Sequence, residues 1–122
     1  MKKKLNSINN ILKKIIRKMI LYHGTSILNA LSILKNGFDI TKSGSCWGNT
    51  YGKGIYFSPN YDTAKFYAGD NGIVLSFDIK INPIYLKKDY SPSSKKKIKI
   101  DENLYNCIVN KNNDEYLILY FI

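Results

Sequence analysis

The stretch Gly52-Lys53-Gly54-Ile55-Tyr56-Phe57-Ser58 lies near the middle of the chain and organises the segments around it. Two glycines on either side of a lysine allow the backbone to approach another group closely, and the Ile-Tyr-Phe run that follows is typical of a short strand. Residues 59–68 then predict a helix. This helix brings Tyr67 back over the strand, so Tyr56 and Tyr67 are placed to hold a flat ring between them.

The chain has 122 residues, enough for one domain with one modest core. Its formal charge of +10 comes almost wholly from lysine, because Arg17 is the single arginine. Such a balance attracts anions of several classes, including nucleic acid, anionic lipid and phosphorylated small molecules. Charge alone therefore does not choose between these partners.

Cysteine usage and the N-terminal sequence bear on the compartment. Cys46 and Cys107 match no metal-ligand or redox spacing, so we expect no zinc site, no disulfide framework and a reducing setting. Lys13 and Lys14 interrupt the apolar region that a signal peptide needs, and no apolar run is long enough to cross a bilayer. We expect an intracellular protein, cytoplasmic or nuclear, without a transmembrane segment.

Residues 1–18 predict a basic amphipathic helix that packs on the core and precedes a compact domain over residues 19–122. Apolar side chains recur there at helical spacing, with lysine and asparagine opposite. The apolar positions are Leu5, Ile8, Leu12, Ile15, Ile16 and Met19. Helices that bind lipid surfaces usually carry Trp or Phe on the apolar face, and this one has neither. Docking on the core is therefore favoured over a membrane-surface or nucleic-acid role.

Met19–His23 predicts an apolar strand that ends at a His-Gly turn, where Thr25 or Ser26 caps a helix over Ile27–Asn36. Gly37 follows at the position where a positive φ is wanted. The helix carries an apolar stripe. Its members are Leu28, Leu31, Ile33 and Leu34.

The remaining segments complete an α+β pattern. Residues 39–51 have no period and many turn formers, so they predict a long functional loop, which contains Trp47. The further predicted strands cover residues 72–81, 84–86, 104–109 and 115–121. The last two form a hairpin in which asparagines take positive φ. The sum is one α+β domain with several short strands and two or three helices.

Four residues are candidates for chemistry: His23 at a strand end, Tyr56, Tyr67, and Glu115 at the mouth of the last hairpin. Each has an ordinary structural interpretation, as a strand-end histidine, core aromatics or a solvated turn carboxylate. If they converge on one cleft, they suit a ligand with sugar hydroxyls, an amide and a flat ring. One carboxylate beside a sugar stabilises an oxocarbenium-like transition state, and NAD+ supplies nicotinamide as the leaving group.

The blocks Leu21–Thr25, Ile33–Phe38, Gly52–Ser58 and Glu115–Tyr120 resemble, in the same order, the catalytic domains of the poly(ADP-ribose) polymerases and tankyrases. The resemblance spans residues 19–122. It implies an ADP-ribosyltransferase-like fold, in which two small, mostly antiparallel sheets form an NAD cleft flanked by two or three helices. It also implies NAD+ as co-substrate and no metal.

The resemblance assigns a role to each candidate. His23 would bond a hydroxyl of the adenosine ribose, and main-chain groups of Gly24 would hold the nicotinamide carboxamide. Tyr56 and Tyr67 would sandwich the nicotinamide ring. Glu115 would bind the 2′-hydroxyl of the nicotinamide ribose and stabilise the cation formed as the glycosidic bond breaks, so the catalytic signature is His23, Tyr56 and Glu115. Further residues expected at the NAD site are Thr25, Trp47, Tyr51, Gly54 and Ala64.

Ala64 departs from the family pattern, which has a serine at this position to bond the carboxamide. Loss of that hydrogen bond weakens NAD+ binding by about 1 kcal/mol. No acceptor site for polymer growth is evident in the sequence. We therefore expect mono-ADP-ribosylation of a protein or nucleic-acid acceptor, by a monomer.

Three other functions compete with this one. Transferases whose signature begins with arginine, and the tRNA 2′-phosphotransferases of related fold, use arginines that lysine does not replace, and this chain has Arg17 alone. A catalytically weak or inactive NAD- or ADP-ribose-binding module is an alternative, against which Glu115 argues. A basic nucleic-acid-binding domain is another, but the lysine runs lie at the periphery of the predicted core without interleaved aromatics.

Overall fold

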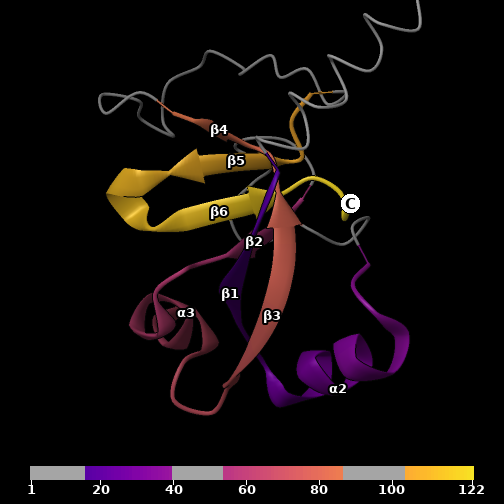
Figure 1. Cartoon of the computed structure of the whole chain (residues 1–122). Coiled ribbons are helices and arrows are strands. Elements are labelled where there is room, and N and C mark those ends of the chain that lie inside the picture. Colours follow the sequence, from indigo (N-terminus) through magenta and orange to yellow (C-terminus); the bar gives the residue numbers. More distant parts are fainter. Residues whose placement is uncertain (1–15, 40–53, 87–103) are drawn as a thin grey trace, which may run out of the picture.

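The computed structural model describes residues 16–39, 54–86 and 104–122 (Figure 1). The predicted helix over residues 1–18 lies almost entirely outside these ranges, and so do Trp47 and Tyr51. The elements are β1 (Arg17–Thr25), α2 (Ile27–Asn36), β2 (Ile55–Phe57), α3 (Tyr61–Ala68), β3 (Ile73–Ile81), β4 (Pro83–Tyr85), β5 (Cys107–Asn110), the short 3-10 helix η2 (Lys111–Asn113) and β6 (Glu115–Ile118).

The strands form two sheets. β1 and β3 make an antiparallel ribbon that runs from the pair Arg17 and Ile81 to the pair Thr25 and Ile73. The second sheet has the order β2-β6-β5-β4 and is antiparallel except between β4 and β5. The predicted α+β fold with two small, mostly antiparallel sheets is confirmed.

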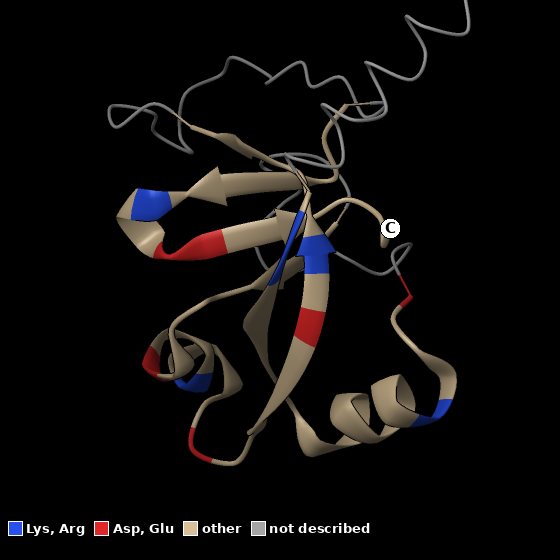
Figure 2. Cartoon of the chain, in the orientation of Figure 1, with Lys and Arg blue, Asp and Glu red and all other residues tan. Residues whose placement is uncertain are grey.

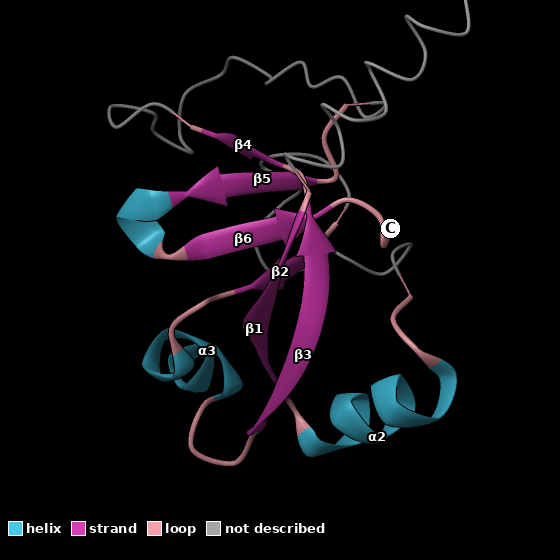
Figure 3. Cartoon of the chain, in the orientation of Figure 1, coloured by secondary structure: helices cyan, strands magenta, loops and turns pink. Residues whose placement is uncertain are grey.

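One backbone pairing joins the two sheets. The Tyr22 N–H donates to the Ser58 carbonyl at 2.7 Å, and the Ser58 N–H donates to the Tyr22 carbonyl at 2.8 Å. Beyond this pair the chain leaves β2 and enters α3. Figure 3 shows α2 and α3 on either side of the end of the ribbon at which β1 finishes, with the four-stranded sheet toward its other end.

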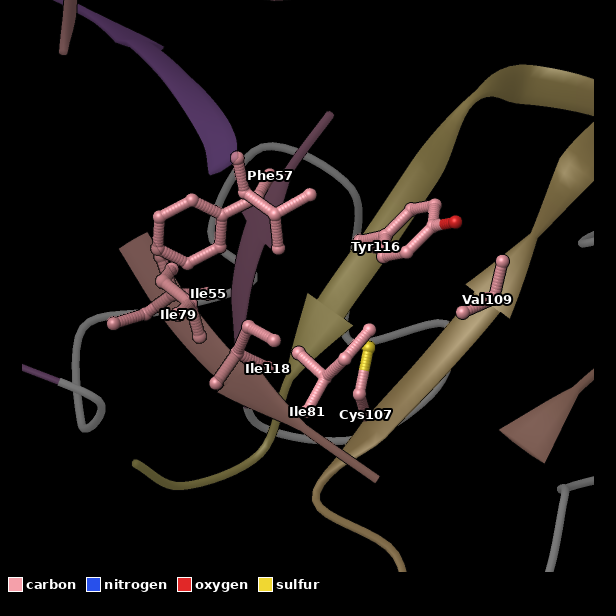
Figure 4. Packing of buried hydrophobic residues seen from close by; sticks show 9 residues of the cluster. Ile55, Phe57, Ile79, Ile81, Cys107, Val109, Tyr116 and Ile118 are labelled. Carbon is pink, nitrogen blue, oxygen red and sulfur yellow. The ribbon is translucent and has the colours of Figure 1, made fainter. Parts of the chain in front are cut away.

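The core lies between the ribbon and the four-stranded sheet (Figure 4). Successive side chains of a strand point to opposite faces, so alternate residues of the strands meet there. The buried members are Leu21, Ile79 and Ile81 of the ribbon, and Ile55, Phe57, Cys107, Val109, Tyr116 and Ile118 of the other sheet. Full burial of such a side chain stabilises the fold by about 1.5–3 kcal/mol. The aromatic group Phe38, Phe57, Phe77 and Phe121 extends this core, with ring centroids 5.1–6.4 Å apart.

A buried asparagine ties the two sheets together at the end of the ribbon. Asn106 is fully buried, and its Oδ1 accepts from the Asn82 N–H at 2.7 Å. Its Nδ2 donates to the carbonyls of Lys80 and Tyr120, each at 3.1 Å. A buried amide is stabilising when its polar atoms are hydrogen-bonded in this way, because no desolvation cost is left uncompensated.

β1 is longer at both ends than the predicted strand Met19–His23. It begins at Arg17, so the predicted N-terminal helix extended too far along the chain. It also runs through Gly24 to Thr25, because β3 offers partners to both residues. Ser26, rather than Thr25, caps α2, and its Oγ accepts from the Asn29 N–H at 3.2 Å.

Helix α2 has the predicted bounds Ile27–Asn36, and Gly37 follows with φ of 80°. Most of its apolar stripe is exposed to solvent. Leu28, Leu31 and Leu34 are 80%, 58% and 66% exposed, whereas Ala30 is buried and Ile33 half-buried. The helix therefore packs on the rest of the domain through the face that carries Ala30 and Ile33. The small side chain of Ala30 allows its backbone to approach closely there.

The last hairpin also differs from the prediction in its turn. Residues Lys111–Asn113 form a 3-10 turn, and Asp114 takes the left-handed conformation, with φ of 51°, that we had expected of the asparagines. Asp and Asn both tolerate this conformation, so the composition of the turn did not decide which residue would adopt it. β5 and β6 are shorter than predicted because the pairing ends at Cys107 and Ile118.

Charge is balanced over the described part of the chain (Figure 2). These residues include six lysines or arginines and six aspartates or glutamates, so their formal charge is zero. The whole excess of +10 belongs to residues 1–15, 40–53 and 87–103. The described part of the fold therefore carries no net formal charge.

Candidate active site

His23 is held in one orientation beside the central strand. Its Nδ1 lies 2.7 Å from the backbone carbonyl of Tyr56, and a carbonyl only accepts, so Nδ1 carries the proton and donates. Burial lowers the pKa of His23 below 6.5, and the hydrogen bond to Tyr56 opposes this shift without cancelling it. The neutral ring therefore presents Nε2 as an acceptor, which suits a ligand hydroxyl. Phe38 and Phe57 pack against the ring at centroid distances of 5.3 Å and 5.4 Å.

Gly24 lies where the two sheets separate. The backbone of Tyr22 bonds to Ser58, and alternate residues of a strand direct their N–H and C=O groups to the same side. Gly24 therefore directs its own pair toward the space that β2 leaves as the chain turns into α3. One donor and one acceptor side by side match a carboxamide, which has the same polar groups as a peptide unit.

A side chain at position 24 has no room. A Cβ built on Gly24 lies 1.8 Å from the carbonyl oxygen of Ala64 and 2.9 Å from the backbone nitrogen of Ala68. Because these are backbone atoms of α3, they cannot swing aside. Gly24 thus sets how closely α3 approaches β1, and α3 carries both Ala64 and Tyr67.

Tyr67 and Glu115 meet across 48 residues of sequence. The Tyr67 hydroxyl donates to Glu115 Oε1 at 2.9 Å, which joins α3 to the first residue of β6. Tyr67 is partly exposed and its ring packs edge-on against Phe66. The carboxylate therefore lies beside the aromatic residue that the sequence predicted to hold the ring.

Tyr56 and Gly54 belong to the outer face of the four-stranded sheet. Tyr56 packs there beside Leu117 and Ile108, and it is the cross-strand partner of Leu117. A Cβ on Gly54 meets the Ile118 carbonyl oxygen and the Leu117 side chain at 2.7 Å. The close approach that this glycine permits in the structure is to β6.

The other residues predicted for the NAD site are Thr25, Ala64, Trp47 and Tyr51. Thr25 is the last residue of β1 and pairs with Ile73. Ala64 is 2% exposed on α3, against Gly24. Trp47 and Tyr51 lie outside the described residues. The sandwich of a ring between Tyr56 and Tyr67 stays a prediction.

Ser58 was missed by the sequence analysis as a site-building residue. It is buried, it links the sheets through its backbone, and its Oγ accepts from the Asn60 N–H at 3.0 Å at the start of α3. The signal that indicates it is local: a serine two residues before Asn60, whose Oδ1 in turn accepts from the Asp62 N–H at 2.9 Å. Ser58 therefore fixes the turn between Tyr56 and the helix of Tyr67.

A shallow depression of about 330 Å³ lies elsewhere, between β3 and the residues that follow β6. Lys18, Asp78 and Lys80 contribute its polar side, and Phe121 and Ile122 its apolar side. None of the predicted site residues lines it. Among the residues that the structure describes, no three His, Cys, Asp or Glu side chains gather as a metal site, and no helix is long and apolar enough to span a membrane.

Two small, mostly antiparallel sheets with two flanking helices fit the ADP-ribosyltransferase-like fold that the sequence predicted. The family of poly(ADP-ribose) polymerase catalytic domains matches residues 2–104. The chain belongs to this family. The match begins and ends earlier than the resemblance over residues 19–122, so the position of Glu115 rests on β6 and on its bond to Tyr67.

A curated relative supports the same family. The poly [ADP-ribose] polymerase tankyrase of Caenorhabditis elegans is 44% identical over 48 residues. This alignment covers 38% of the present chain and 2% of the relative, so the chain spans a very small part of that protein.

Arg17 stands apart from the site, since its guanidinium donates to the Tyr85 hydroxyl on β4. It does not supply the arginine on which the rival transferases depend.

Proposed function

We propose that this chain is an NAD-dependent ADP-ribosyltransferase that transfers one ADP-ribose unit to a macromolecular acceptor. The observation that carries the proposal is the hydrogen bond between Tyr67 and Glu115, at 2.9 Å. It places a carboxylate beside the tyrosine assigned to the nicotinamide ring, although the two residues are 48 positions apart. Membership of the poly(ADP-ribose) polymerase catalytic domain family supports the choice of NAD+ as co-substrate.

Substrate binding uses His23 and Gly24. The Nε2 atom of neutral His23 accepts from a hydroxyl of the adenosine ribose, because Nδ1 is committed to the Tyr56 carbonyl. The N–H and C=O of Gly24 take the nicotinamide carboxamide as a further rung beside β1. Tyr56 and Tyr67 then cover the two faces of the nicotinamide ring.

Bond cleavage depends on Glu115. As the bond between nicotinamide and ribose breaks, its electron pair stays on the nicotinamide nitrogen and positive charge spreads over C1′ and the ring oxygen of the ribose. A carboxylate that holds the neighbouring 2′-hydroxyl stabilises this oxocarbenium-like transition state more than the ground state. The nucleophilic atom of the acceptor then bonds to C1′ and releases its proton to solvent.

The proposal extends to the acceptor and to the cellular compartment. The sequence shows no evident acceptor site for polymer growth, so we propose a single transfer to a protein or nucleic acid. We also propose that the enzyme is a monomer. Cys107 is a free, buried thiol, in keeping with a reducing compartment, the cytoplasm or the nucleus. The basic segments outside the described residues would bring an acidic acceptor to the domain.

The proposal is tested by nicotinamide release and label transfer from labelled NAD+. Glu115→Gln keeps the size and hydrogen-bonding shape of the side chain and removes its charge, so we expect the rate to fall by about a hundredfold or more. Asp114→Asn is the matched control, because it removes one charge from the adjacent residue and asparagine tolerates the same left-handed backbone. We expect this control to keep the wild-type rate.

Other outcomes identify the competing functions. NAD+ or ADP-ribose that binds to wild type without any nicotinamide release indicates a binding module. Tight binding of DNA or RNA without affinity for NAD+ indicates a nucleic-acid-binding domain and overturns the proposal.

A further inference from the structure

Tyr67 makes two different contacts with its two ends. Its ring packs edge-on against Phe66, at a centroid distance of 5.8 Å, and its hydroxyl donates to Glu115 Oε1. The hydroxyl must be the donor, because an ionised carboxylate only accepts. The role expected from the sequence, stacking on a flat ring, uses the ring and leaves the hydroxyl without a function.

Both ends of this hydrogen bond are fixed by their own elements. Helix α3 is capped at its start by Asn60 and held against β1 by the contact between Gly24 and Ala64. Glu115 pairs with Asn110 at the first rung of the β5–β6 hairpin. The bond therefore connects two anchored backbones and restricts the rotation of a side chain that has three flexible torsions.

We propose that Tyr67 is a positioning residue for Glu115, which it holds through the hydroxyl while the ring serves the nicotinamide. This inference rests on the proposed function. With Oε1 held by Tyr67, the carboxylate is oriented so that Oε2 receives the 2′-hydroxyl of the nicotinamide ribose. Charge-assisted hydrogen bonds of this kind are stronger than neutral ones, so the phenol keeps the carboxylate in its productive rotamer before substrate arrives.

Tyr67→Phe tests the hydroxyl and preserves the ring. We expect kcat for nicotinamide release to fall about tenfold or more, because the carboxylate loses its orientation in the transition state. KM for NAD+ is expected to change less than twofold, because the stacking face remains. Tyr61→Phe is the matched control: it removes the same atom from a partly exposed tyrosine of the same helix, and we expect wild-type kinetics.

A double-mutant cycle separates positioning from a general structural effect. In a Glu115→Ala background, Tyr67→Phe is expected to cause no further loss of rate, because no carboxylate is left to orient. An equal loss in both backgrounds, a wild-type kcat for Tyr67→Phe, or a raised KM with unchanged kcat would each overturn the proposal.

The chain offers a second readout that does not require activity. Glu102 and Glu115 are its two glutamates, so selective 13C labelling of glutamate carboxyls gives two NMR signals, and Glu102→Gln assigns them. Tyr67→Phe is expected to move the Glu115 signal, and Tyr61→Phe to leave it in place. A Glu115 signal that is the same in wild type and Tyr67→Phe contradicts the hydrogen bond itself. A shifted signal in a protein that releases no nicotinamide refutes the proposed function, and with it the catalytic role of Tyr67, while the contact stands.

Discussion

His23 is the single histidine of the chain, so its protonation is seen against no background from other imidazoles. Packing against Phe38 and Phe57 shields much of the ring from water, which destabilises the charged form more than the neutral form. The Tyr56 carbonyl accepts a hydrogen bond from Nδ1, and this bond partly offsets the effect of burial on the pKa of His23. The lowered pKa favours the neutral ring at neutral pH, and its Nε2 can then accept from a ribose hydroxyl.

Stability is expected to depend on pH through this residue. Because the folded pKa lies below 6.5, the unfolded chain binds the proton first as the pH falls. The free energy of unfolding is therefore constant above the unfolded value and decreases as the pH falls from about 6.5 to the folded pKa, by up to ~1.4 kcal/mol per pH unit.

Urea unfolding of wild type and His23→Gln at several pH values between 8 and 5 measures this effect. We expect the stability difference between the two proteins to shrink as the pH falls, because glutamine does not titrate. A difference that stays constant over this range would show that burial does not lower the pKa of His23.

Ala64 occupies the position at which the family resemblance predicts a serine. Ala64→Ser returns a hydroxyl to the helix position expected to face the carboxamide, and one neutral hydrogen bond contributes about 1 kcal/mol. We therefore expect KM for NAD+ to fall about fivefold in steady-state assays of nicotinamide release. Ala68→Ser, one turn later on α3, is the control and should leave KM unchanged. An Ala64→Ser protein with a raised KM would show that the buried serine costs more than it contributes.

The elements owe their relative positions to a few close contacts. Gly24 lets α3 approach β1, Gly54 lets β2 approach β6, and Asn106 bonds the segment before β5 to the segments after β3 and β6. The first two contacts place Tyr67 and Glu115 on facing backbones. The third lies at the far end of the ribbon, so it affects the site only through the stability of the fold.

Asn106→Ala is expected to reduce the free energy of unfolding by about 3 kcal/mol or more. The substitution leaves the buried Asn82 N–H and the part-buried carbonyls of Lys80 and Tyr120 without their side-chain partner, and a buried group in this state costs about 1–3 kcal/mol. Urea denaturation measures the loss. Asn112→Ala, in the exposed turn before β6, is the control and should cost less than 1 kcal/mol. A similar loss in both variants would refute a special role for Asn106.

At the scale of the whole molecule, the sequence predicted elements better than their contacts. The bounds of α2 follow from Ser26, Gly37 and a local apolar period, and the strand of Tyr56 follows from β-prone residues after a glycine pair. Such signals lie within a few residues of one another, so a local sequence pattern is enough to predict the element.

Long-range contacts have no comparable signal. Asn106 bonds to backbone groups 14 to 26 residues away, and any residue supplies such groups, so nothing in its neighbourhood marks it as buried. The stripe of Leu28, Leu31 and Leu34 has the period of a packed face, yet these side chains are exposed. In the site, the pair Tyr67 and Glu115 was grouped by family resemblance, whereas their hydrogen bond comes from the structure alone.

The pairing of β2 with β6 has a consequence for biosynthesis. Ile55 pairs with Ile118, so β2 cannot form its pairing with β6 until more than sixty further residues have been synthesised. Closing so long a loop costs chain entropy before the two strands form any contact. Proteins dominated by such long-range pairings therefore fold slowly. Because a ribosome delivers the chain from its N-terminus, His23 and Tyr56 emerge long before Glu115. A nascent chain that stops before Glu115 contains His23, Tyr56 and Tyr67 but lacks the proposed catalytic carboxylate, so the proposed transfer of ADP-ribose cannot begin before β6 has been made.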